Sequence, residues 1–95
     1  MTSEEHLPDD HVDGNALAGP LAEVFTADVT VAQSECAHCG ATGPVARLLV
    51  YRDAPGLVAR CQECGQVVLR YVRTASAAHL DMRGTVTLAF SLAPE

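Results

Sequence analysis

Four cysteines are the residues of this sequence with the most definite chemistry. They form two pairs with two residues inside each pair, Cys36 with Cys39 and Cys61 with Cys64, and 21 residues lie between the pairs. This spacing allows both sulfurs of a pair to bind one metal ion at about 2.3 Å. A glycine follows each pair and can adopt the positive φ that a tight turn around a metal requires. The pattern predicts one metal site with four ligands, Cys36, Cys39, Cys61 and Cys64.

The expected ion is a single zinc, bound for a structural purpose. Four thiolates fill a tetrahedral site and leave no position for a catalytic water. A single iron ion also accepts four thiolates, so a rubredoxin-like iron electron carrier is the alternative. The cores of such carriers are rich in aromatic residues, whereas this chain contains two Phe, two Tyr and no Trp. That composition favours zinc over iron.

The length of the chain explains why it needs a metal. Ninety-five residues form one small domain, close to the size at which an apolar core alone stabilises a fold. Zinc binding contributes on the order of 10–16 kcal/mol, which exceeds the typical stability of a domain. We therefore expect the β-rich part of the chain to be largely unfolded without its metal.

The N-terminal residues indicate the cellular compartment in which the protein is expected. Residues 1–12 contain four acidic residues and show no hydrophobic periodicity, so they are predicted to be a disordered acidic tail. They do not have the pattern of a signal peptide, and no stretch of the chain approaches the roughly 20 apolar residues of a membrane span. We therefore expect a cytoplasmic protein that does not bind membranes. In that compartment paired cysteines favour metal binding over disulfides.

Residues 13–95 are predicted to form a single zinc-ribbon domain that begins with a helical segment over 13–27. Asp13 can cap the first turn of a helix. Apolar residues then recur at helical spacing, at Leu17, Leu21, Val24 and Phe25. Pro20 cannot lie inside one continuous helix without the loss of a hydrogen bond. Two short helices are therefore expected, the second starting at Pro20.

The remainder, residues 29–92, is predicted to be a β-rich ribbon of antiparallel hairpins with rubredoxin-like turns at the cysteines. Strands are predicted over residues 29–33, 45–52, 57–61, 66–73, 78–83 and 85–92. The last two strands are expected to extend the sheet, with Gly84 as a turn or bulge between them. Alternation in the last strand places four side chains inward, Val86, Leu88, Phe90 and Leu92.

The charge is distributed unevenly along the chain, whose formal net charge is −6. Residues 1–35 contain eight acidic residues and no basic one, whereas residues 36–84 contain six Arg and three acidic residues, a formal charge of +3. Four thiolates around one zinc ion leave this second part near +1. Four arginines would face phosphate in a nucleic-acid-binding ribbon, Arg47, Arg60, Arg70 and Arg73. The low charge disfavours that function and favours a solvated strand face that the acidic N-terminal arm screens.

Two histidines are further candidates for chemistry. His38 lies between the first two cysteines, but four cysteines already complete the site, so we expect it to face solvent. His79 and Asp81 share one face of a predicted strand, and we expect them to form a surface pair because no nucleophile motif accompanies them. The sequence contains no phosphate-binding loop and no typical pair of catalytic carboxylates. It predicts a protein that is not an enzyme.

Several segments together resemble a known family. They are the sequence DGNALAGPL over 13–21, the two CxxCG pairs, the hairpin over 50–61 and the sequence LDMRG over 80–84. The chain resembles a family of short, uncharacterised, zinc-ribbon-like proteins of actinobacterial type, described as a domain of unknown function. The resemblance extends over about residues 12–92, and it implies a zinc site at the four cysteines. It implies no established activity.

The leading interpretation is a zinc-stabilised, non-enzymatic binding module whose partner is a protein. A thiol redox sensor that releases zinc on oxidation is an alternative of a different class. The iron carrier and the nucleic-acid-binding ribbon are further alternatives. The apolar helical residues between Leu17 and Phe25 are expected to pack inside the domain, although an exposed apolar helix would also recruit a partner.

Overall fold

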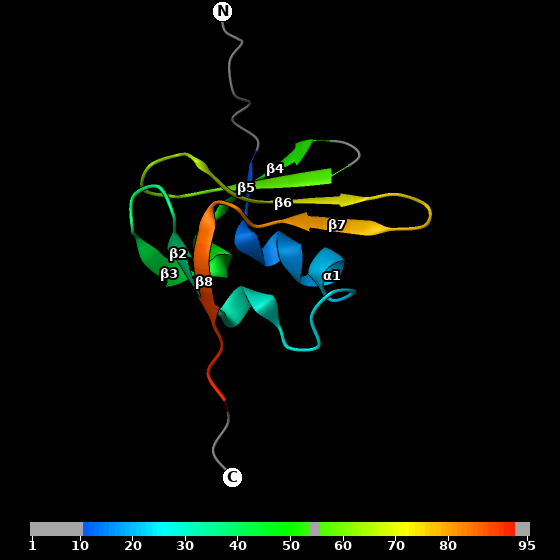
Figure 1. The fold of residues 1–95 in the computed structure, drawn as a ribbon, viewed down its shortest axis with the longest axis horizontal. Helices are drawn as coiled ribbons and strands as arrows, with labels where there is room; N and C mark the ends of the chain where they lie inside the picture. The colour runs from blue at the N-terminus through cyan, green and yellow to red at the C-terminus, as the bar shows by residue number, and fades with distance from the viewer. Residues whose placement is uncertain (1–10, 54–55, 93–95) are drawn as a thin grey trace, which may run out of the picture.

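The computed structural model describes residues 11–53 and 56–92, and strands dominate it (Figure 1). The elements in chain order are β1 Val12–Asp13, the 3-10 turn η1 Gly14–Leu17, α1 Ala18–Leu21, the 3-10 turn η2 Val29–Val31, β2 Gln33–Cys36, β3 Thr42–Pro44, the 3-10 turn η3 Val45–Arg47, β4 Leu49–Asp53, β5 Gly56–Arg60, β6 Val67–Arg73, β7 Ala78–Asp81 and β8 Thr85–Ala89. The prediction of a small β-rich fold with antiparallel hairpins and a short helical segment is confirmed.

The larger sheet contains five antiparallel strands in the order β1-β4-β5-β6-β7. Its centre is the predicted hairpin, in which Asp53 pairs with Gly56 and Leu49 pairs with Arg60. The middle of the predicted turn, residues 54–55, lies outside the described residues. The predicted strand over 45–52 starts four residues late, because Val45–Arg47 forms a 3-10 turn whose first residue is buried in the core.

The smaller sheet contains three strands in the order β3-β2-β8, and two predictions were wrong here. The predicted strand over 29–33 begins as a 3-10 turn, because the carboxylate of Asp28 accepts hydrogen bonds from both the backbone N–H and the hydroxyl of Thr30. Strand β8 does not extend the larger sheet as expected; it pairs with β2, which lies about 50 residues earlier in the chain. Only β7 extends the larger sheet.

A register shift in the β2–β8 pairing reverses the predicted orientation at the start of β8. The shift lies between Glu35 and Cys36, where one strand carries an extra residue. Thr85, predicted to point outward, is half-buried and donates a hydrogen bond from its hydroxyl to the carbonyl oxygen of Val68. Val86, predicted to point inward, is 55% exposed. After the shift Leu88 and Phe90 pack against the core as predicted, whereas Leu92 is exposed.

The helical segment is shorter than predicted, and its two parts join two residues earlier. Asp13 caps η1 as expected, because its side chain accepts a hydrogen bond from the backbone N–H of Asn15. The α-helix begins at Ala18 and not at Pro20. Pro20 is then its third residue, where a helical N–H has no partner in any case, so no hydrogen bond is lost. Val12 forms β1, although the sequence assigned it to the tail, whose residues 1–10 lie outside the described residues.

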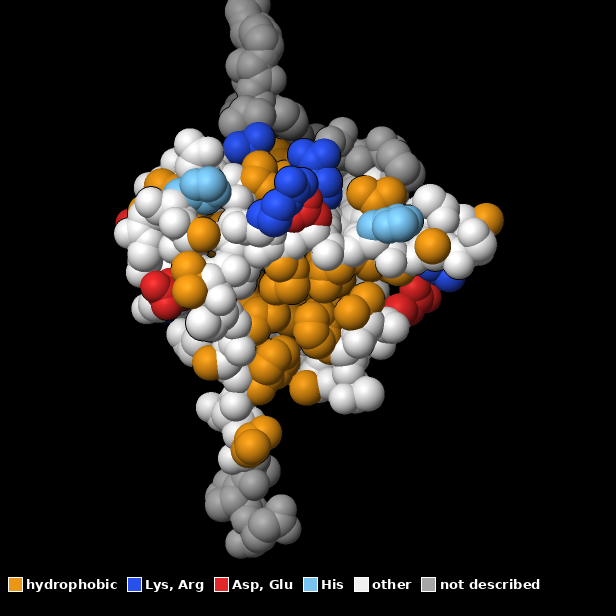
Figure 2. Space-filling model, in the orientation of Figure 1, with side chains coloured by type: hydrophobic (Ala, Val, Ile, Leu, Met, Phe, Trp, Pro, Cys, Tyr) orange, Lys and Arg blue, Asp and Glu red, His pale blue; other side chains and the backbone are white. Residues whose placement is uncertain are grey.

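The core lies between the larger sheet, the helical segment and the start of the smaller sheet. Leu17 and Leu21 are buried there, as the sequence predicted, while Val24 is 44% exposed. Eight partly buried hydrophobic residues pack against this core, and five of them come from the turn after α1 and from the segments around β7 and β8: Phe25, Leu80, Met82, Leu88 and Phe90. Figure 2 shows a broad hydrophobic surface between the positions that β7 and β8 occupy in Figure 1. We call these five residues the apolar surface.

None of the helices within the described residues has the length and the hydrophobicity that a membrane crossing requires.

Candidate metal centre

The four predicted ligands come together in space. The sulfur atoms of Cys36, Cys39, Cys61 and Cys64 all lie within 4.8 Å of one another. The Sγ atoms of Cys36 and Cys64 are 3.7 Å apart, and those of Cys39 and Cys61 are also 3.7 Å apart. A tetrahedral site with zinc–sulfur bonds of about 2.3 Å has sulfurs about 3.8 Å apart. The arrangement therefore fits one tetrahedral metal ion.

Each cysteine pair is shaped by the glycine that follows it. Gly40 and Gly65 have φ angles of 79° and 78°, a conformation that residues with a Cβ rarely adopt. Their N–H groups donate hydrogen bonds to the carbonyl oxygens of Cys36 and Cys61, both at 2.9 Å, which closes each turn. The predicted positive φ is thereby confirmed at both positions.

Backbone N–H groups point at the buried sulfur atoms. The N–H of His38 donates to the sulfur of Cys36 at 3.4 Å, and the N–H of Glu63 donates to the sulfur of Cys61 at 3.3 Å. Such hydrogen bonds stabilise the thiolate form, and they hold each sulfur in the direction in which it binds a metal.

The pKa values of Cys36 and Cys39 shift in opposite directions. Burial raises the pKa of Cys36. Backbone hydrogen bonds from Cys39 and His38 and contacts with neighbouring thiols have a larger, opposite effect and lower this pKa to about 7. A backbone hydrogen bond from Ala41 lowers the pKa of Cys39, yet burial and the neighbouring thiols raise it to about 12. Ionisation of Cys36 thus opposes ionisation of Cys39 beside it. A bound divalent cation removes this repulsion, because it binds all four sulfurs as thiolates.

The centre joins the two sheets. Cys36 is the last residue of β2, and Cys61 follows the last residue of β5. These two cysteines are buried, whereas Cys39 and Cys64 lie on the solvent side. A metal at this point would therefore cross-link two sheets that share no strand. The exposed cysteines leave one side of the site accessible to small solutes.

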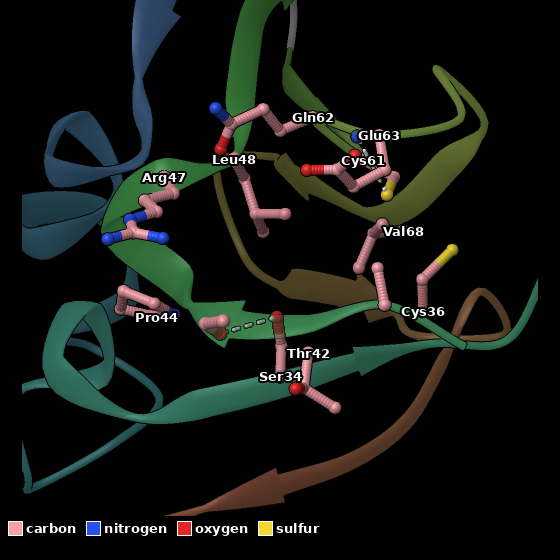
Figure 3. Close-up of a pocket in the computed structure, with 12 residues that line it drawn as sticks. Ser34, Cys36, Thr42, Pro44, Arg47, Leu48, Cys61, Gln62, Glu63 and Val68 are labelled. Atoms are coloured by element: carbon pink, nitrogen blue, oxygen red, sulfur yellow. Dashed lines mark hydrogen bonds between the residues drawn. The ribbon is translucent and has the colours of Figure 1, made fainter. Parts of the chain in front are cut away.

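A small pocket lies beside the two buried cysteines (Figure 3). It has a volume of about 50 Å³, and its wall includes Ser34 and Arg47 on one side and Gln62 and Glu63 on the other. The hydroxyl of Ser34 donates to the carbonyl oxygen of Gly43 at 3.3 Å, so this buried polar group is satisfied. The volume accommodates a few water molecules and is far below that of a typical ligand pocket, about 300–1,000 Å³.

The two histidines that the sequence singled out, His38 and His79, are exposed. His38 is exposed and is not part of the sulfur cluster, as the sequence predicted. We expected Asp81 to pair with His79, but in the structure it pairs with Arg83. The Nε–H of Arg83 donates to the two carboxylate oxygens of Asp81 at 3.0 and 3.1 Å. Asp81 consequently has a pKa of about 2, and hydrogen bonds from Arg83 are the largest cause.

The arginines are spread over several surfaces of the molecule. Arg73 pairs with Glu23 at 3.0 Å, so one acidic residue of the N-terminal arm does cover one Arg of the strands. Arg60 donates to the carbonyl oxygen of Gly65 at 2.8 Å and lies 6.0 Å from the centre of the Tyr51 ring. Arg47 lines the small pocket. Arg73, Arg60 and Arg47, three of the four arginines considered for phosphate binding, thus each contact a different part of the fold.

The sequence alone did not identify two features of the surface. One is the apolar surface, whose residues alternate on strands and therefore have the pattern of core residues. The other is the cluster of Arg70, Asp81 and Arg83, which depends on the pairing of Arg70 with Asp81 across β6 and β7. The charge alternation in the LDMRG segment was the available signal for the second feature.

Comparison with known proteins shows the family of the chain. No curated protein and no solved structure matches it. One family model matches residues 8–93, which is nearly the whole chain and a slightly longer stretch than the resemblance over 12–92. On this match the chain belongs to DUF6510, a family of unknown function.

Proposed function

We propose that this protein is a non-enzymatic binding module of the cytoplasm, stabilised by one structural zinc ion, and that its partner is a protein. The observation that carries the proposal is the apolar surface, next to a metal centre that has no open coordination position. Four sulfurs fill a tetrahedral site, so a metal bound there has a structural role and does not activate water. The small pocket beside the cysteines has too little volume for an ordinary substrate.

Zinc is the ion that the ligand set favours. Four thiolates at tetrahedral spacing suit zinc and iron alike. A core poor in aromatic residues favours zinc over iron, because Tyr71 is the only aromatic residue of the buried core in the described part of the chain. Metal analysis of protein purified from its native host tests this assignment. We expect zinc in equimolar amount and no visible absorption, whereas a coloured protein that contains iron would support an electron carrier.

The apolar surface supports a protein partner. Its five side chains come from β7 and the turn after it, from β8 and the residue after it, and from the turn after α1. The rings of Phe25 and Phe90 lie 6.0 Å apart and tilted by 38°, so they bridge the helical segment and the smaller sheet. A broad apolar surface that stays partly open to solvent, as in Figure 2, is typical of protein interaction sites.

The proposal is tested by affinity capture from the native host. The bait is zinc-loaded protein, either unchanged or with the double substitution Phe25→Gln and Phe90→Gln. The matched control carries Val31→Gln and Leu92→Gln, because these residues are 71% and 87% exposed and lie outside the apolar surface. We expect one dominant partner that the Phe variant loses and the control retains. An identical set of captured proteins for all three baits would contradict the proposal, provided that zinc content and circular dichroism are unchanged.

A thiol redox sensor is the second candidate, and the exposure of Cys39 and Cys64 favours it. A peroxide would oxidise the Cys39 thiolate to a sulfenic acid and leave as water or alcohol. The Cys61 thiolate, whose sulfur is 3.7 Å away, would then form a disulfide with Cys39 and displace water. Loss of two thiolate ligands would release the zinc. Zinc release at low peroxide concentration that a thiol reductant reverses would support this function, and resistance to peroxide would exclude it.

A further inference from the structure

A second pocket lies at the other side of the metal turns, where β8 begins. It has a volume of about 400 Å³, within the range of ligand sites. Its lining includes two apolar residues, Val67 and Val68, and four polar side chains that we call the rim: His38, Arg70, Asp81 and Arg83. The pocket therefore combines residues from the first cysteine turn, from β6 and from the segment that joins β7 to β8.

The rim of this pocket carries an excess of positive charge. Asp81 binds Arg83 directly, and that ion pair uses the single carboxylate of the rim. Arg70 pairs with Asp81 in the β6–β7 register and adds a second guanidinium to the same pocket. Two arginines against one acidic residue leave one positive charge for a ligand. An arginine beside apolar residues is well suited to a carboxylate, which it binds with two parallel hydrogen bonds.

The pocket and the apolar surface meet along β8. The strand starts directly after Gly84, which lines the pocket, and it leads to Leu88 and Phe90 of the apolar surface. In Figure 2 basic side chains and an acidic side chain gather immediately above the hydrophobic surface. Within the described residues β8 pairs with β2 alone, so its other edge presents unpaired backbone groups along the same path.

We propose that this path binds one extended segment of the partner protein, which pairs with the free edge of β8, covers the apolar surface with apolar side chains and places a carboxylate against Arg70. The inference rests on the proposed function and specifies the chemistry of its partner. Backbone hydrogen bonds to an open strand edge provide affinity, and pockets along the edge select the side chains. An antiparallel segment would have its acidic residue toward its C-terminal end, because β8 starts at the pocket.

The proposal predicts a peptide motif that a selection experiment can detect. A display library of random short peptides is selected on zinc-loaded protein and, in parallel, on the variant Arg70→Glu. We expect the unchanged protein to enrich apolar residues followed by an acidic residue, and the variant to enrich a basic residue at the same position. The best peptide should bind Arg70→Glu at least about tenfold more weakly, because it loses a charge-assisted hydrogen bond.

Two controls separate the charge effect from a loss of structure. Arg47→Glu introduces the same charge change at a residue of the small pocket, away from β8, and should leave peptide binding unchanged. Arg70→Gln removes the positive charge without adding a negative one, and it should weaken binding without inverting the selected motif. Amide hydrogen exchange on the complex should show new protection at alternate residues of Thr85–Ala89. Protection elsewhere, with β8 unchanged, would overturn the strand-pairing geometry.

The outcomes also distinguish this inference from the proposed function. Selection of apolar peptides without an acidic residue, together with a host partner that Arg70→Glu still captures, would overturn the inference and leave the protein-binding function standing. A random single-stranded oligonucleotide serves as the competing ligand. If it binds in a manner that depends on Arg70 and on salt while no acidic peptide is enriched, the rim recognises phosphate and the inference is wrong.

Discussion

Two residue types at the cysteine turns have separate physical roles. The cysteines provide the ligands, and the glycines at 40 and 65 provide a backbone conformation that directs N–H groups toward the sulfurs. The carbonyl of each first cysteine accepts the N–H of its glycine, and this hydrogen bond closes each turn. The turns thus hold the two cysteines of each pair side by side, and the fold brings the two pairs together.

The ion pair between Asp81 and Arg83 gives a prediction at the scale of one residue. The pKa of Asp81 is about 2 in the folded protein, below its ordinary value of 3.8. This depression stabilises the fold above about pH 4, and the contribution is lost as the pH falls through about 2. We expect Arg83→Gln to raise the pKa toward 3.8, as measured by carboxyl-carbon NMR titration. Arg47→Gln is the control, and an unchanged Asp81 titration in Arg83→Gln would contradict the assignment.

A pair of glycines in the helical segment tests the packing of whole elements. A Cβ added at Gly14 would lie 1.8 Å from the carbonyl oxygen of Val45, whereas nothing lies within 4 Å of a Cβ at Gly19. Gly14→Ala must push η1 away from η3, and we expect a loss of about 1–3 kcal/mol or more in the free energy of unfolding. Gly19→Ala should cost much less, because the only close neighbour that its Cβ meets is the adjacent Pro20, which mildly disfavours a helical conformation for the residue before it. Denaturant titration of both variants measures the difference, and equal effects would contradict this packing.

The elements differ in how far the sequence predicts them. The hairpin of β4 and β5 and the following strand β6 lie next to each other in the chain, so turn residues and alternation were sufficient to locate them. The smaller sheet was not predicted, because the pairing of β2 with β8 joins segments about 50 residues apart. The 3-10 turn at Val29–Val31 depends on one side chain, Asp28, whose hydrogen bonds override the β propensity of two valines.

At the scale of the whole molecule, the candidate metal centre takes its cysteines from two sheets that share no strand, so a bound ion would link them. Chelation of the ion should therefore remove most β structure, since zinc binding contributes on the order of 10–16 kcal/mol and a small domain has about 5–15 kcal/mol of stability. We expect a strong loss of far-UV circular dichroism and of the cooperative thermal transition on treatment with a zinc chelator. Both should return when zinc is added.

Single substitutions identify which residues this effect requires. Cys36→Ser should prevent folding in the presence of zinc, because Cys36 is buried and ends β2. His38→Ala is the matched control in the same turn, since His38 is exposed and outside the sulfur cluster. A chelated protein with an unchanged spectrum and thermal midpoint would refute a structural role for the metal.

The whole fold also decides which apolar residues are accessible to a binding partner. From the sequence, the helical residues at 17, 21, 24 and 25 form one candidate stripe. In the structure Leu17 and Leu21 are 0% and 1% exposed, so polar substitutions there would unfold the core and would not report on binding. Phe25 is half-buried, so it reaches the surface, where its ring contacts that of Phe90 from the other end of the chain. The interaction surface is therefore a product of tertiary packing.

The sequence by itself determined the candidate metal centre, since the cysteine spacing and the two glycines encode local turns that suit a tetrahedral ion. It also determined the hairpin next to that centre. Only the tertiary structure decided where the chain is open to other molecules. The shift of register between β2 and β8 exposes Val86 and turns Thr85 inward, and the β6–β7 pairing brings Arg70 to Asp81. The physical reason is that strand alternation records which residues share a face, whereas distant strand pairing decides which face is covered.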